Sequence, residues 1–219
     1  MYRFASRTIL SLLMAGIIPV LGTSTSMAVT IDFADGSWNG AQGQTSFTSV
    51  VEGTTVGLTS LGGPITVNYN GGPSGDNSGR DGLGIGDDEI TQSSPERLTI
   101  SFAGPVTLQT VNITDLFRNE GGIGRHEVGW YSINGGAYSS FAAAFGQLNG
   151  LTNGLLTLNI NALNVDSITF RANRDSYSDF SVRGLTYTAS VPEPSTLIML
   201  GFGFLIAAAL YRRGYFQSV

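Results

Sequence analysis

The chain has 219 residues, with 11 Arg, 16 Asp plus Glu, one His and neither Lys nor Cys, and its formal net charge is -5. This acidic balance excludes a protein that tracks nucleic-acid phosphates, because such proteins need a basic face. The absence of Cys excludes disulfides and thiolate zinc sites, and a single His argues against imidazole-based metal catalysis.

The N-terminus has the pattern of a secretory signal peptide. Arg3 and Arg7 precede an apolar run at residues 9–21, and small residues at Ser26 and Ala28 fit the pocket of signal peptidase. We therefore predict that residues 1–28 are a signal peptide that signal peptidase removes after Ala28. The domain that follows is then exported.

Residues 29–190 show apolar residues that alternate with polar ones, which is typical of strands with one buried face. The clearest segments are 29–33, 65–69, 98–102, 156–160 and 180–187, and weaker candidates are 56–61, 106–117, 128–133, 138–145 and 165–170. Asn134-Gly135-Gly136 predicts a tight hairpin between two of them. We predict an all-β fold, a β-sandwich of the jelly-roll type, because strands recur without a convincing helix.

The predicted domain carries seven Arg and fifteen acidic residues, which gives a net charge of -8. Its densest polar segment is residues 76–89, which holds five acidic residues and one Arg in fourteen positions, together with several glycines. Calcium prefers several oxygen ligands, so this segment predicts a calcium site at Asp81, Asp87, Asp88 and Glu89 with help from backbone carbonyls. A solvated acidic loop without a metal is the alternative. The glycines at 82, 84 and 86 do not predict nucleotide binding, because acids follow them where a phosphate would need amide donors.

A second polar group surrounds a glycine-rich turn at residues 121–124. Glu120 and Glu127 lie on its two sides, and Trp130 and Tyr131 follow. The aromatic pair, together with Tyr138, predicts a surface on which sugar rings stack, although adjacent strand residues face opposite sides and one of the pair is expected in the core. The two glutamates could act as a glycosidase pair if they faced each other, and an ion-paired hairpin tip is the alternative.

The C-terminus carries an uncharged apolar run at residues 197–211, directly followed by Arg212 and Arg213. Residues 195–211 would form a helix about 26 Å long at about 1.5 Å per residue, at the short end of what spans a bilayer core. We predict a single transmembrane helix with its basic end inside, which leaves residues 214–219 as a short cytoplasmic tail.

Val191-Pro192-Glu193-Pro194 stands immediately before this run. A signal peptide, an exported domain, Pro-Glu-Pro, a short apolar helix and an Arg pair together resemble the PEP-CTERM sorting tail of Gram-negative bacteria, over residues 191–213. The resemblance implies an inner-membrane intermediate, cleavage by exosortase, and release to the outer surface or the matrix, in association with exopolysaccharide or biofilm. An ordinary single-pass anchor is the alternative.

The domain also resembles the ectodomains of many PEP-CTERM proteins, which are similar to carbohydrate-binding jelly rolls. The resemblance rests on the segments 82–85, 88–90, 96–102, 111–117 and 179–185. It carries no catalytic motif, so the sequence predicts a non-enzymatic binding or structural component of the extracellular polysaccharide layer. The alternative is a glycan-active enzyme, a glycoside hydrolase or lyase, that acts on the same exopolysaccharide.

Overall fold

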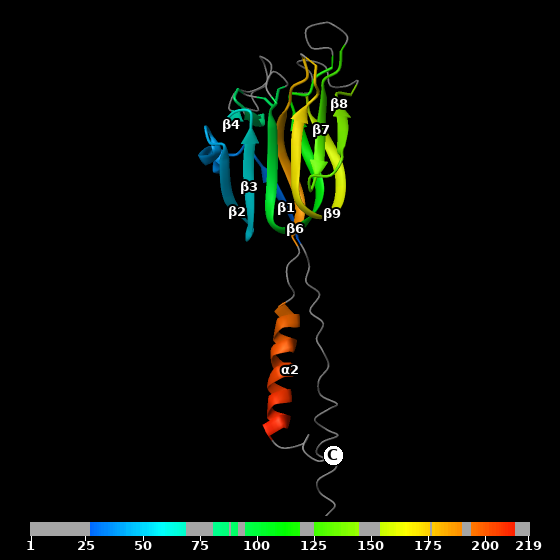
Figure 1. The fold of residues 1–219 in the computed structure, drawn as a ribbon. Helices are drawn as coiled ribbons and strands as arrows, with labels where there is room; N and C mark the ends of the chain where they lie inside the picture. The colour runs from blue at the N-terminus through cyan, green and yellow to red at the C-terminus, as the bar shows by residue number, and fades with distance from the viewer. Residues whose placement is uncertain are drawn as a thin grey trace, which may run out of the picture. The chain divides into compact units, whose positions relative to one another are not determined.

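The computed structural model describes residues 27–68, 81–87, 89–91, 95–118, 125–144, 154–175, 177–189 and 194–212, without the side chains of residues 68, 194–199 and 211. The chain divides into two units, and the described residues of each are treated separately: a domain at residues 27–189 and a C-terminal helix (Figure 1). Residues 1–26 of the predicted signal peptide lie outside the described residues, whereas Met27 is exposed and Ala28 is the first residue of a strand.

The domain is built almost entirely from strands, which confirms the predicted all-β class. Its described elements are β1 (Ala28–Asp32), the 3-10 helix η1 (Gly36–Ala41), β2 (Ser46–Val51), β3 (Thr54–Leu61), β4 (Ile65–Asn68), β5 (Gly82–Ile85), β6 (Arg97–Thr114), β7 (Val128–Ile133), β8 (Tyr138–Ala142), β9 (Leu156–Ala172) and β10 (Ser181–Ala189).

Two long strands, β6 and β9, organise the sheet. Each contains two segments that the apolar pattern predicts as separate strands, because the residues between the two segments also belong to the strand. The two strands pair antiparallel, with register shifts between Ser101 and Thr110 of β6. On its other edge, β6 pairs first with β3, opposite residues 97–102, and then with β10, opposite residues 106–114.

The sheet therefore branches at β6. Its main path is β4-β5-β10-β6-β9-β7-β8, with β1 added to β10 and the β2-β3 hairpin added to β6. The predicted jelly-roll sandwich is not confirmed, since the described strands form one open, continuous sheet. The physical reason is that β6 and β9 bend at register shifts but continue as single strands, so the pairing is not divided between two separate sheets.

The core joins strands that are not hydrogen-bonded neighbours. Tyr187 of β10 is fully buried, its ring centroid lies 5.2 Å from that of Phe102, and its hydroxyl donates to the carbonyl of Val51 on β2 at 3.3 Å. Phe141 of β8 packs edge-on against Phe180 at 5.1 Å between ring centroids. These aromatic rings pack into the same apolar interior, so the single continuous sheet still surrounds a hydrophobic core.

Residues 82–85, within the acidic segment 76–89, form a strand that the apolar pattern does not predict. They form β5, which pairs with β4 and also with β10 through Leu83 and Val182. Leu83 and Ile85 are fully buried. Gly82 allows β5 to approach the backbone of β10 at Val182 closely, and the alternation of Gly with Leu and Ile forms a short buried strand.

The predicted hairpin after Ile133 is present. Asn134 and Gly135 have φ values of 50° and 69°, as tight hairpins require, and β7 pairs antiparallel with β8. The Asn134 side-chain oxygen accepts hydrogen bonds from the amides of Asp166 and Ser167, at 2.8 and 3.0 Å. The hairpin is therefore fixed against β9, and it brings Tyr138 of β8 beside β7.

The helix α2 (Pro194–Arg212) begins at the last residue of Pro-Glu-Pro, where a missing amide costs nothing, and ends on a basic residue. Its large apolar side chains are exposed at Leu200, Phe202, Phe204, Leu205, Ile206 and Leu210. Within the part of the chain that the structure describes, no helix combines the length and apolar character needed to cross a membrane, so the predicted transmembrane helix is not confirmed.

Candidate functional site

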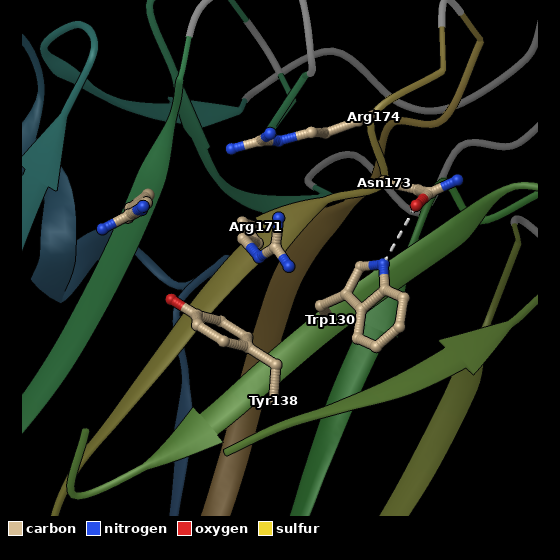
Figure 2. A pocket seen from close by; sticks show the side chains of 6 residues that line it. Trp130, Tyr138, Arg171, Asn173 and Arg174 are labelled. Atoms are coloured by element: carbon tan, nitrogen blue, oxygen red, sulfur yellow. Dashed lines mark hydrogen bonds between the residues drawn. The ribbon is translucent and has the colours of Figure 1, made fainter. Parts of the chain in front are cut away.

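A cleft of about 370 Å³ opens on the surface over β6, β7, β8 and β9. Its size is in the range of small-ligand sites. The residues that line it are Arg97, Trp130, Tyr138, Arg171, Asn173 and Arg174. Their side chains are drawn in Figure 2, where Arg171 lies between the rings of Trp130 and Tyr138 and Arg174 lies above it.

The strand register explains why these side chains meet. Phe170 of β9 pairs with Leu98 of β6 on one side and with Tyr131 of β7 on the other. These three side chains point toward the core, so their immediate neighbours on each strand point outward. Arg171 pairs with Trp130 in this outward row, and Arg97 precedes Leu98 at the start of β6.

The two aromatic rings hold the guanidinium of Arg171. Its Cζ atom lies 4.5 Å from the ring centroid of Tyr138 and 5.5 Å from that of Trp130. The Trp130 indole nitrogen donates to the side-chain oxygen of Asn173 at 3.2 Å, which fixes the ring (Figure 2). These contacts are cation–π interactions, which engage the faces of the guanidinium and leave its in-plane N–H groups for an anion.

The cleft is basic on an acidic domain. It contains Arg97, Arg171 and Arg174, three of the seven arginines of the domain. Among the described residues, none of the three makes an ion pair. The Nε of Arg171 is buried without a hydrogen-bond acceptor in that same part of the chain. Like charges on adjacent strands are unfavourable, so the cluster costs stability unless an anion binds.

Asp175 organises the turn that supports the cleft. Its carboxylate accepts hydrogen bonds from the Asn173 side-chain amide at 2.7 Å and from the backbone amide of Ser178 at 2.8 Å. Burial raises the pKa of Asp175, but the hydrogen bonds from Ser178, Asn173 and Tyr177 outweigh it, and the pKa lies below its ordinary value of 3.8. The ionised carboxylate thereby orients Asn173, which holds Trp130.

Asp175→Asn is expected to lower the free energy of unfolding by about 1 kcal/mol at pH 7, because charge-assisted hydrogen bonds are lost. A carboxyl whose pKa is lowered by folding stabilises the domain above its unfolded pKa. That contribution disappears as pH falls below about 4 and through the folded pKa. Urea denaturation of both proteins at pH 7 and pH 3 checks this, and a difference that grows on acidification would contradict it.

The predicted glycan-binding residues that the structure describes do not lie together in one site. Trp130 lines the cleft, whereas Tyr131 packs against the core and its ring centroid lies 6.5 Å from that of Phe141. Glu127 is buried, and one carboxylate oxygen accepts a hydrogen bond from the backbone amide of Phe117, so it lies within the fold. Glu120 lies outside the described residues. Sequence reasoning missed Arg97, Arg171 and Arg174.

The predicted calcium ligands lie on the two sides of β5. Asp81 is buried before β5, and Asp87 follows at its other end, exposed to solvent. Glu89 is half-buried, and its backbone carbonyl accepts from the amide of Ile85. Asp88 lies outside the described residues. In those that are described, no three acidic, His or Cys side chains gather as metal ligands do, and calcium binding stays a prediction.

The C-terminal unit supplies a second functional element. Pro194 begins α2 and Arg212 ends it, while Val191, Pro192, Glu193 and Arg213 lie outside the described residues.

Comparison with known families identifies this C-terminal element. Residues 190–213 match the PEP-CTERM protein-sorting motif, which confirms the prediction for this segment. The motif implies export to the cell envelope or surface, with exosortase as the processing partner. No curated protein and no solved structure matches the chain.

Proposed function

We infer that the chain is an exported, exosortase-processed component of the extracellular polysaccharide layer, and that its β domain acts by binding rather than by catalysis. The sorting motif at residues 190–213 carries this inference. The domain would be released to the outer surface or matrix of a Gram-negative bacterium after processing, with the C-terminal segment holding the precursor at the inner membrane first.

The helix supports the membrane-held precursor. From Ser195 to Tyr211 the sequence contains no charged residue, and the described large apolar side chains are exposed. The free energy of such a helix is lower in an apolar environment than in water. Arg212 at its end favours the cytoplasmic side, because positively charged flanks tend to remain there.

The position of Glu127 supports a binding function over the glycan-active alternative. A retaining glycosidase places two carboxyls beside the scissile bond, about 5 to 5.5 Å apart. Glu127 is instead buried and bound to the amide of Phe117. Release of reducing ends from the organism's own exopolysaccharide, lost in Glu127→Gln, would establish the enzyme alternative instead.

Glu193→Ala, and separately the pair Arg212→Ala with Arg213→Ala, are expected to abolish processing and leave a membrane-retained precursor. Both changes lie inside the matched motif, and the second also removes the charges that orient the helix. Immunoblots of membrane and matrix fractions, with intact-mass measurement, check the result.

Gln217→Ala is the matched control, since it lies outside the motif and is expected to be processed normally. Wild-type protein that reaches the matrix with its C-terminus intact to Val219 would contradict the proposal.

A further inference from the structure

We propose that the cleft over β6, β7, β8 and β9 binds an anionic saccharide, in which the rings of Trp130 and Tyr138 contact a sugar and Arg97, Arg171 and Arg174 bind its carboxylates. The ligand class is a uronate-containing glycan. The proposal deepens the binding function inferred above and rests on it only for the source of the glycan. The cleft itself is argued from its own residues.

The charge of the cleft is the first argument. The domain has a net charge of -8, yet three of its seven arginines converge here without an ion pair among the described residues. A guanidinium presents N–H donors in a fork that matches a carboxylate. An anionic ligand would relieve the repulsion among the arginines and accept hydrogen bonds from the terminal N–H groups of the cleft.

The aromatic rings are the second argument, and they point to a saccharide rather than a bare anion. Trp130 and Tyr138 are half-buried and form walls of the same cleft, and the Trp130 nitrogen is already bonded to Asn173. What remains for a ligand is the ring surface that Arg171 does not cover, which provides apolar contact area. A sugar acid combines an apolar ring face with a carboxylate, so it matches both halves of the site.

The acidity of the rest of the domain favours a short ligand confined to the cleft over a nucleic acid. A nucleic-acid strand carries a phosphate at every nucleotide and needs a basic track along its path. Beyond the cleft, the domain has four further arginines and fifteen acidic residues. The basic surface is confined to the cleft, so it fits a short anionic segment of a ligand.

The test is isothermal titration of the full chain in detergent with a galacturonate hexasaccharide, a neutral glucose hexasaccharide, inorganic sulfate and a single-stranded DNA hexamer. The galacturonate hexasaccharide is expected to bind at least tenfold more tightly than the other three, and more weakly as salt is raised. Arg171→Gln is expected to weaken it tenfold or more, and Arg174→Gln, at an exposed position, to weaken it several-fold without affecting folding.

Arg125→Gln is the matched control. Arg125 also lies over an aromatic ring, 4.8 Å from the centroid of Tyr177, but it does not line the cleft, so binding is expected to be unchanged. The proposal is overturned by equal binding of the neutral hexasaccharide or sulfate, by tighter binding of DNA, by an equal loss in Arg125→Gln, or by no binding of the uronate. Processing of the sorting motif is independent of these results, so a failure of either proposal can be recognised by itself.

Discussion

Gly82→Ala is expected to destabilise the domain by about 3 kcal/mol or more, among the largest effects of any single methyl addition. Gly82 has a φ of 122°, which side chains other than hydrogen rarely allow, and an added Cβ would overlap the carbonyl oxygen of Val182. Both groups belong to strand backbones that pair in the sheet, so neither can yield cheaply. The variant must separate β5 from β10 or distort the core around Leu83.

Chemical denaturation followed by tryptophan fluorescence checks this, because Trp38 is buried in the same domain. Gly104→Ala is the control. Gly104 lies in β6 with no heavy atom within 4 Å of an added Cβ and no positive φ, so its effect is expected to remain within about 0.5 kcal/mol. Equal midpoints for Gly82→Ala and the wild type would show that β5 does not pack as described.

Phe170→Ala is expected to cost about 3 to 5 kcal/mol, as large-to-small changes of buried aromatic residues do. Phe170 is fully buried on β9, between Leu98 and Tyr131 in the register. Removing its ring opens a cavity directly beneath the outward row that contains Arg171. We therefore expect weaker binding at the cleft as well as lower stability.

Leu163→Ala on the same strand provides the comparison, because Leu163 is 72% exposed and its loss is expected to be nearly neutral. Urea denaturation of the two variants measures the difference in free energy of unfolding. A similar midpoint for both would contradict the placement of Phe170 in the core.

Local pattern was sufficient to predict the strands that have one buried face. Ile31, Ile65 and Leu185 alternate with polar neighbours, and the structure buries all three. The same pattern failed at β5, where Gly, rather than a polar residue, alternates with Leu and Ile. It also failed at residues 101–106, because a register shift inside β6 looks like the end of a strand.

The candidate site was only partly predictable, for a related reason. Trp130 could be identified as a stacking residue from its type and its place in a strand. Which of Trp130 and Tyr131 faces outward depends on the register of β7 against β9, where Tyr131 lies opposite the buried Phe170. Arg97 and Arg171 are 74 positions apart, and nothing in either local segment indicates that they share a cleft.

The sequence by itself determined the sorting motif, the all-β class and the acidic character of the domain, because each depends on residue order or composition over a short range. Tertiary structure alone decided the branching of the sheet at β6, the burial of Glu127 and the convergence of three arginines beside two aromatic rings. The physical reason is that strand pairing is long-range. A register shift of one residue turns every side chain to the opposite face, and period-two patterning cannot tell which distant strand will be the partner.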